Sequence, residues 1–374
     1  MTITLIAITL LFEFLTKGVL LSPQNITNLI MQNSCILLLS IGMMLCILTG
    51  GNIDLSVGSV LAFVGAINGK LIITKEMPIH FVISLVIFLG FLIGAWQGFW
   101  IAYVRIPSFI VTLSGMLIFR GLAVLTLKGM TLTPFPNIFQ EISGGFVFNF
   151  LKIKYKTQFV TYTFALILTI IYICLQVLKR NKKERRDNIY LFLIKNVFVC
   201  IVIFLCVTPF ANFKGIPIIL IILGIITLFY SFVTQKTIYG RYVYAVGGNE
   251  KAAKCSGIDT NKVLFYVYVN MSVLAAIAGI VFSSRTNSAS PQAGINFELD
   301  AVTSCYIGGA SASGGIGTIM GAIIGGTVMG VLNNGMSIMG IASDVQMTIK
   351  GIALITAVAF DVISKNSKVI RNVV

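Results

Sequence analysis

Charged side chains are scarce in this sequence. Only 10% of the 374 residues are Asp, Glu, Lys or Arg, and there is a single histidine, His80. Soluble domains carry about 25% charged residues, so a soluble fold of this composition could not cover its own surface. One histidine also excludes any metal site that needs two. With a mean hydropathy of +0.97 and 57% hydrophobic residues, the sequence predicts a helical membrane protein.

Catalytic and redox motifs are also missing. The seven cysteines lie mostly inside apolar runs and lack metal-ligand spacing, so they are expected to be small hydrophobic side chains. The chain has no G-x-x-x-x-G-K-[ST] phosphate loop; the nearest string, GAINGKL at 65–71, has the wrong spacing. No Ser–His–Asp or paired-carboxylate arrangement is present. We therefore expect no cofactor in this chain, and the energy for any transport must come from another polypeptide or an ion gradient.

Basic residues are concentrated between the apolar runs, and the net charge is +15. The run KRNKKERRD in the loop 179–188 would be costly to move across a membrane, which favours a cytoplasmic position. This distribution explains the charge better than nucleic-acid binding does. It also predicts cytoplasmic amino and carboxyl termini and a cytoplasmic position for 239–259.

The apolar runs predict an all-α, polytopic membrane protein of about twelve transmembrane helices. A span needs about 20 apolar residues. Residues 1–374 form one transmembrane domain, because the longest outer loop, 128–157, is too short for a core of its own. The candidate spans are 2–21, 29–49, 55–74, 79–102, 109–127, 158–178, 189–209, 216–235, 263–283, 300–318, 319–341 and 347–364.

The polar interval Tyr239–Asp259 predicts a short helix between spans. Asn249 suits the N-cap, and Gly257 suits a left-handed C-cap. A free helix of two turns is marginal in water, so it is expected to contact a partner. Lys251 and Lys254 either contact that partner or only mark the cytoplasmic side. The residues assigned to this coupling role are Gly247, Gly248, Asn249, Glu250, Lys251, Ala252, Ala253, Lys254, Ser256 and Gly257.

Two glycine-rich segments interrupt the apolar pattern, Thr49–Ser59 and Ile307–Gly317. Irregular backbone at membrane depth must be buried in protein or face water, and paired interruptions are typical of transport pathways. They could equally be tight cytoplasmic turns. Elsewhere, small residues four apart predict close helix contacts, at Gly90, Gly94 and Gly98 and at Gly317, Gly321, Gly325, Gly326 and Gly330.

Several charged residues fall within or beside spans. The basic residues within them include Arg120, Lys195 and Lys350, and the acids Asp54 and Asp300 lie at span starts. Asp54 and Asp300 are each either functional intramembrane acids or caps of the helices that follow them. Arg120 is expected to pair with an acid of another span or to bond free carbonyls, rather than to contact a solute.

Four segments together resemble the membrane permease subunits of bacterial ABC sugar importers of the ribose and xylose type, closest to the xylose or multiple-monosaccharide branch. They are TGGNIDLSVGSV (49–60), FRGLA (119–123), GRYVYAVGGNEKAAKCSGI (240–258) and FELDAVTSCYIGGASASGGIGTIMGAIIG (297–325). The resemblance covers essentially the whole chain and implies a type II-like permease fold.

The resemblance also implies function and partners. A permease of this kind imports a monosaccharide such as xylose across the cell membrane, as a pair of permease copies. An ATP-binding subunit with two nucleotide-binding domains holds ATP and Mg, and an extracytoplasmic protein delivers the sugar. Because sugars are neutral, the path is expected to be weakly polar, with candidates Asn52, Asp54, Asn68, Gln97, Arg120, Asn333 and Asn334.

Two other functions are considered. An ion-driven secondary sugar carrier would need buried acids as ion sites, and the acids here lie mostly at span ends. A membrane enzyme would need clustered catalytic residues, which the sequence lacks. Whether uptake requires ATP distinguishes the ABC importer from the ion-driven carrier.

Overall fold

The computed structural model describes residues 2–147, 157–181 and 189–371. Every regular element among them is a helix, as predicted. In chain order they are α1 (Thr2–Leu15), α2 (Pro23–Leu48), α3 (Val57–Asn68) with its π-helical extension η1 (Gly69–Thr74), α4 (Ile79–Ala102), α5 (Ser108–Leu127), α6 (Asn137–Gly144), α8 (Thr157–Asn181), α9 (Ile189–Ala211), α10 (Ile218–Lys236), α11 (Ile238–Gly248), α12 (Glu250–Cys255), α13 (Thr260–Thr286), α14 (Phe297–Ile307), α15 (Ile319–Ile338) and α16 (Ser343–Arg371).

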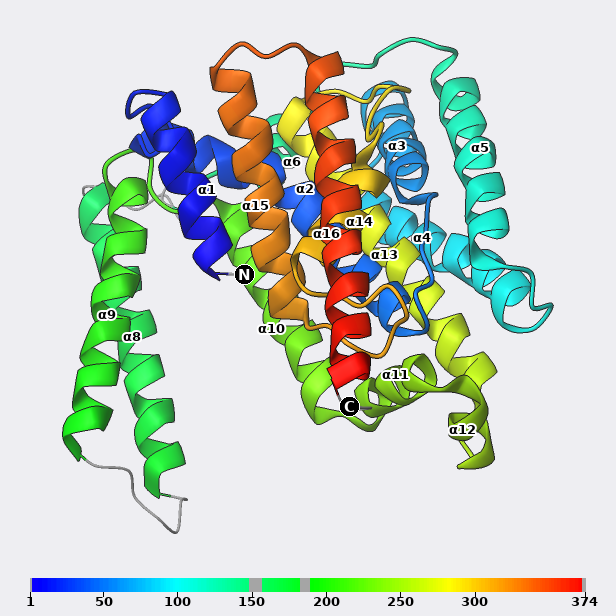
Figure 1. The fold of residues 1–374 in the computed structure, drawn as a ribbon. Coiled ribbons are helices and arrows are strands. Elements are labelled where there is room, and N and C mark those ends of the chain that lie inside the picture. The colour runs from blue at the N-terminus through cyan, green and yellow to red at the C-terminus, as the bar shows by residue number, and fades with distance from the viewer. Residues whose placement is uncertain (1, 148–156, 182–188, 372–374) are drawn as a thin grey trace.

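The helices form one bundle around α2 and α13, which are the most buried spans (Figure 1). α13 packs against α2, α3 and α4, and α14 packs against α15. The pair α8–α9 stands to one side of the bundle, and α16 lies on its surface. Many large apolar side chains on these outer helices are exposed, as expected of a surface covered by membrane lipids.

Glycines allow the closest helix contacts, as the four-residue spacing predicts. A Cβ at Gly94 of α4 would lie 2.6 Å from the Val269 Cα of α13. A Cβ at Gly325 of α15 would likewise overlap the Ser304 carbonyl oxygen of α14. Gly317 differs from the prediction, since it precedes α15 and has a φ of +152° in non-helical backbone.

Ten helices in the described part of the chain are long and apolar enough to cross a membrane, rather than the predicted twelve. The predicted span 2–21 yields α1, which at about 1.5 Å per residue rises roughly 21 Å, short of the ~30 Å hydrocarbon core. The predicted span 300–318 yields only the 11-residue α14, followed by irregular backbone at the glycine-rich segment. Apolar residues such as Val302, Ile307 and Ile316 make the run look like a span, but its glycines and serines do not sustain the helix.

The two ends of the bundle carry different elements (Figure 1). One, the α6 end, holds α6 and the connection 287–296. The other, the α12 end, holds α11, α12 and the last residues of α16. The end of α8 also lies there, although the rest of the basic loop, 182–188, falls outside the described residues, as does 148–156 of the loop 128–157. The carboxyl end of α16 and 239–259 therefore lie at the same end of the bundle, consistent with the prediction that both face one side of the membrane.

The loop 128–157 is less irregular than expected, because it contains α6. Phe139 of α6 is fully buried, and the Ser143 N–H donates to the Ser284 hydroxyl of α13 at 3.0 Å. The Leu132 and Ala289 backbones also pair across two hydrogen bonds. The loop is thereby fastened to the α6 end of α13.

Candidate functional site

The coupling segment folds as its cap residues predict. The Asn249 side-chain oxygen accepts from the Ala252 N–H at 3.0 Å and so caps α12. Gly257 adopts a φ of +82°, and the Ile258 N–H returns to the Ala253 carbonyl at 3.1 Å. α12 is only six residues long, and a second helix, α11, precedes it and extends through Gly247 and Gly248. Sequence reasoning missed α11.

α12 is largely exposed at its end of the bundle. Ala252, Lys251 and Lys254 lie on the open side, together with Ser256. Ala253 is the exception, because it is 5% exposed and packs into the core. The helix therefore presents a free surface, and Ala253 anchors it rather than forming part of that surface.

Arg105 fixes α12 to the turn between α4 and α5. Its guanidinium pairs with the Glu250 carboxylate at 2.5 Å and donates to Thr260 Oγ1 at 3.1 Å and to Asn261 Oδ1. Partial burial alone would raise the pKa of Glu250, but the bond and charge of Arg105 outweigh it and hold that pKa below its ordinary value. Arg105 lies in the loop between the predicted spans 79–102 and 109–127, and its pairing could not be predicted because it depends on tertiary contact.

Gly247 joins α11 to both glycine-rich segments. A Cβ at Gly247 would overlap the Leu48 carbonyl oxygen and lie 2.7 Å from the Gly315 nitrogen. The Gly315 N–H in turn donates to the Leu48 carbonyl at 3.0 Å. We call this contact of 247, 48 and 315 the glycine junction. The two interrupted segments thus meet each other and α11 at the α12 end.

The first interrupted segment is buried and internally bonded. The Asp54 carboxylate accepts from the Ser56 N–H at 2.8 Å and from its hydroxyl at 2.7 Å. The Gln97 amide of α4 donates to the same hydroxyl at 2.7 Å. α3 begins at Val57, so Asp54 does not cap it directly as predicted; it holds the Ser56 N-cap residue instead. Asn52 bonds Thr49 and Ser108 beside this group.

Arg120 bonds free carbonyl oxygens, which is one of the two roles predicted for it. Its guanidinium donates to the carbonyl oxygens of Pro291 and Ala293, at 2.7 Å each. These carbonyls belong to the connection before α14, at the α6 end. Arg120 therefore bonds free backbone and stabilises this loop. Asn68 lies apart, fully buried at the end of α3, with no hydrogen bond to its amide among the described residues.

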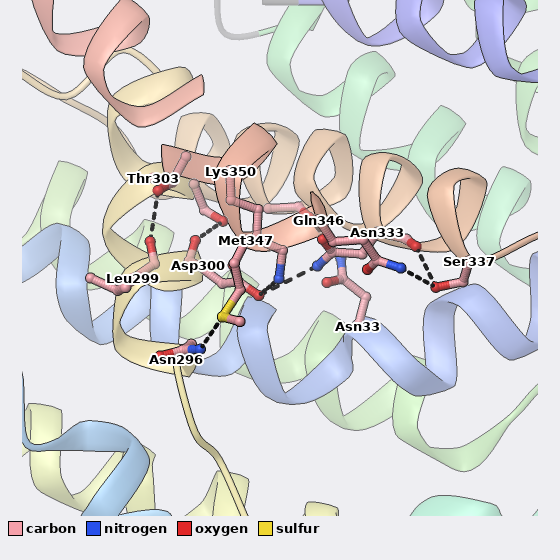
Figure 2. A network of polar contacts seen from close by, with 12 residues as sticks. Asn33, Asn296, Leu299, Asp300, Thr303, Asn333, Ser337, Gln346, Met347 and Lys350 are labelled. Atoms are coloured by element: carbon pink, nitrogen blue, oxygen red, sulfur yellow. Dashed lines mark hydrogen bonds and ion pairs between the residues drawn. The ribbon is translucent and has the colours of Figure 1, made fainter. Parts of the chain in front are cut away.

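A polar cavity of about 210 Å³ lies among α2, α13, α14, α15 and α16. Figure 2 shows part of its lining, with Asn33, Asp300, Asn333 and Lys350 coming together from four of these helices. We call it the polar cavity, and its polar lining residues are Gln32, Asn33, Arg285, Asp300, Asn333, Asn334, Ser337, Gln346 and Lys350. A larger cavity of about 600 Å³, along α8 and α9, has an almost wholly apolar lining.

An ion pair crosses the polar cavity. The Lys350 ammonium of α16 contacts the Asp300 carboxylate of α14 at 2.9 Å, and the Asn333 amide donates to the same oxygen at 3.4 Å. Asp300 is 3% exposed. Its carboxylate binds these side chains instead of capping α14, whose N-cap residue is Asn296. Sequence reasoning placed Lys350 within a span but did not pair it.

The predicted path residues therefore divide into separate places. Asn333 and Asn334 line the polar cavity, and Asn334 also exchanges hydrogen bonds with Asn25 at 2.8 and 3.2 Å. Asn52, Asp54 and Gln97 form the buried group near the α12 end. Across the parts of the chain that the structure describes, no three His, Cys, Asp or Glu side chains are placed to hold a metal ion.

Comparison with known proteins gives the family. The family described as "Branched-chain amino acid transport system / permease component" matches residues 25–358. This chain belongs to that permease family. The permease is thus a transport subunit and not an enzyme, and its apolar helices make it a multi-pass membrane protein.

The permease also resembles individual proteins along nearly its whole length. It is 34% identical to the "Xylose transport system permease protein XylH" of Haemophilus influenzae, over 98% of this chain and 96% of that protein. It is 33% identical to the XylH of Escherichia coli K12, over 98% and 91%. The "Ribose import permease protein RbsC" of Haemophilus influenzae is 31% identical, over 91% and 85%. No solved structure matches the permease.

Proposed function

We propose that this permease imports a monosaccharide, xylose or a related sugar, and that ATP hydrolysis in a separate subunit drives the import. The permeases of similar sequence are described as acting on xylose and ribose. The observation that carries the ATP-driven part is the coupling segment: α12 is capped at both ends, exposed, and joined through Gly247 to both interrupted segments.

The coupling follows from a two-state equilibrium between outward-open and inward-open permease. Shifting such an equilibrium from mostly one state to mostly the other takes about 5 kcal/mol of differential binding. An ATP-binding subunit that binds α12 more tightly in one state would supply this free-energy difference, and the glycine junction would transmit it to the two interrupted segments. The carboxylate–guanidinium pair of Glu250 and Arg105 would carry it to the turn before α5.

The proposal includes three partners and an orientation. The α12 end faces the cytoplasm, where a subunit with two nucleotide-binding domains binds ATP and Mg. A sugar-binding protein docks at the α6 end, and a second permease copy completes the pore. The exposed apolar surface of α16, whose span is not buried within one chain, is available to lipid or to that copy.

An ion-driven carrier is the second candidate, because the buried Asp300 carboxylate of α14 pairs with the half-buried Lys350 of the span α16. Uptake of labelled xylose and ribose by membrane vesicles separates the two functions. We expect uptake with internal ATP and none with a proton gradient alone. Uptake at full rate on a gradient without ATP would refute ATP-driven import.

A further inference from the structure

The polar cavity contains buried polar groups that no protein group satisfies. Asn33 Oδ1, Asp300 Oδ1 and Asn333 Oδ1 are buried and have no hydrogen bond within the described residues. Asn33 and Asp300 are 4% and 3% exposed. An unsatisfied buried acceptor costs roughly 1–3 kcal/mol, so three around one cavity indicate that something else bonds them there.

The cavity also offers donors. The Lys350 ammonium has three N–H groups, of which the Asp300 carboxylate takes one. The Gln346 amide also lines the cavity, but its two N–H groups already donate to the Ile341 carbonyl at 2.8 Å and to the Ser337 hydroxyl at 3.5 Å, so Lys350 is the main donor. A hydroxyl group both donates and accepts, so a solute with several hydroxyls can satisfy both kinds of group at once.

Charge and size narrow the class of solute. Lys350 and Asp300 largely neutralise each other, while Lys350 and Arg285 would repel a cation and Asp300 an anion. At about 210 Å³ the cavity is smaller than the roughly 300–1,000 Å³ that drug-sized ligands occupy. Phe297 adds one aromatic ring to the lining. These properties suit a small, neutral, polyhydroxylated molecule with an apolar face.

The position of the cavity connects it to the coupling segment. Asp300 is in the first turn of α14, and α14 ends at Ile307, where the second interrupted segment begins. That segment reaches the glycine junction at Gly315. One short helix thus links the cavity to the place where α11 contacts the bundle.

We propose that the polar cavity binds one monosaccharide during its passage, and this rests on the proposed function. Asn33, Asp300 and Asn333 accept hydrogen bonds from the sugar hydroxyls, and Lys350 donates to them. Ordered water filling the same space is the competing explanation, and the experiments below separate it from sugar binding.

The first experiment is thiol protection in native membrane vesicles that contain the whole transport complex. Ser337→Cys places a thiol in the cavity wall. The exposed Cys174, Cys206 and Cys255 and the half-buried Cys200 are first replaced by alanine. We expect 10 mM D-xylose or D-ribose to slow the reaction of this thiol with a small hydrophilic reagent by about threefold or more.

The control thiol lies outside the cavity at the same end of the bundle. Gln24→Cys is exposed in the first turn of α2, and its reaction rate should not change with either sugar. If both sugars leave the Ser337→Cys rate unchanged, or slow both thiols equally, the cavity is not the sugar site.

The second experiment compares uptake kinetics of two buried polar deletions. Asn333→Leu removes a cavity amide, and we expect the KM for sugar uptake to rise about three- to tenfold, the effect of one or two hydrogen bonds. Thr303→Val removes a buried hydroxyl of α14 whose one hydrogen bond within the described residues is to the Leu299 carbonyl of its own helix, at 2.7 Å. The KM of this variant should stay at the wild-type value.

The outcomes for this inference and for the proposed function are distinct. If uptake requires ATP while Asn333→Leu leaves KM unchanged, the permease is ATP-driven and the cavity assignment is wrong. If uptake proceeds without ATP while Ser337→Cys is protected, the cavity binds sugar and the ATP-driven function is wrong. Should Asn333→Leu fail to accumulate in the membrane, the protection experiment decides alone.

Discussion

At Gly247 the missing side chain lets three backbone segments meet. The Leu48 carbonyl, the Gly315 N–H and α11 share a space that a single methyl group would fill. The neighbouring Gly248 has no atom within 4 Å of the position a Cβ would take. Two adjacent glycines therefore have different structural roles, although both end the same helix.

Gly247→Ala tests the glycine junction. The added methyl must push Leu48 and Gly315 apart, and overpacking of this kind costs about 1–3 kcal/mol. We expect a lower thermal unfolding midpoint in detergent and a loss of ATP-dependent uptake. Gly248→Ala is the matched control and should keep the wild-type midpoint; equal midpoints for the two variants would contradict the junction.

Helix caps could be predicted from single residues, whereas ion pairs between distant residues could not. Asn249 and Gly257 act within four residues of chain, so their types alone indicate the ends of α12. Asp300 and Lys350 are fifty residues apart, and only the packing of α14 beside α16 brings them together. Arg105 and Glu250 pair across an even longer interval.

At the scale of elements, α12 combines a buried anchor with an exposed face. Ala253 is buried, while Ala252 lies on the open side. A carboxylate at 253 would disturb the permease itself, so only the exposed position can test docking cleanly.

Ala252→Asp should abolish ATP-dependent uptake while the permease remains in the membrane at its normal amount. The aspartate adds charge and bulk to the surface proposed to bind the ATP-binding subunit, without entering the core. Ala252→Ser, which adds only a hydroxyl, should retain most of the activity. Co-purification of the subunit with each variant provides the measurement, and undiminished binding to Ala252→Asp would place the docking surface elsewhere.

Element boundaries were predictable where apolar runs were uniform and not where glycine and serine interrupted them. The spans of α4 and α5 lie close to the predicted 79–102 and 109–127. The run 300–318 contains a helix and then a glycine-rich loop that still carries apolar residues, so its composition could not separate them. Sequence reasoning missed α11 because its tyrosines and arginine gave the segment a polar composition, which is typical of a loop.

For the whole molecule, the direction of each span agrees with the alternation predicted from the basic loops. α2 runs toward the α12 end, and the later spans alternate from it until α16 returns there, except that α13 and α15 both run toward the α6 end and the short α14 with the irregular backbone after it makes the return between them (Figure 1). The side of the membrane that the α12 end faces is a prediction from the loop charges.

Native Cys255 reports this orientation directly. It is exposed on α12, so a membrane-impermeant maleimide should label it in permeabilised cells and leave it unlabelled in intact cells. Cys255→Ser provides the background from the other cysteines. Met130→Cys, exposed at the α6 end, should show the reverse and label in intact cells; labelling of Cys255 from outside would invert the topology.

Of the helices that line the polar cavity, α16 is the least buried against the rest of the chain. None of the apolar span of α16 is buried within the chain, yet Lys350 crosses to Asp300 from it. Besides this ion pair, α16 is held by the Asn296 amide, which donates to the Met347 sulfur at 3.2 Å, and by the Ala312 N–H, which donates to the Asp361 carboxylate at 3.3 Å. Moving α16 away would break these few polar contacts while exposing no fully buried part of its span. A lipid or protein that contacts the outer face of α16 would therefore affect how easily a solute enters the polar cavity.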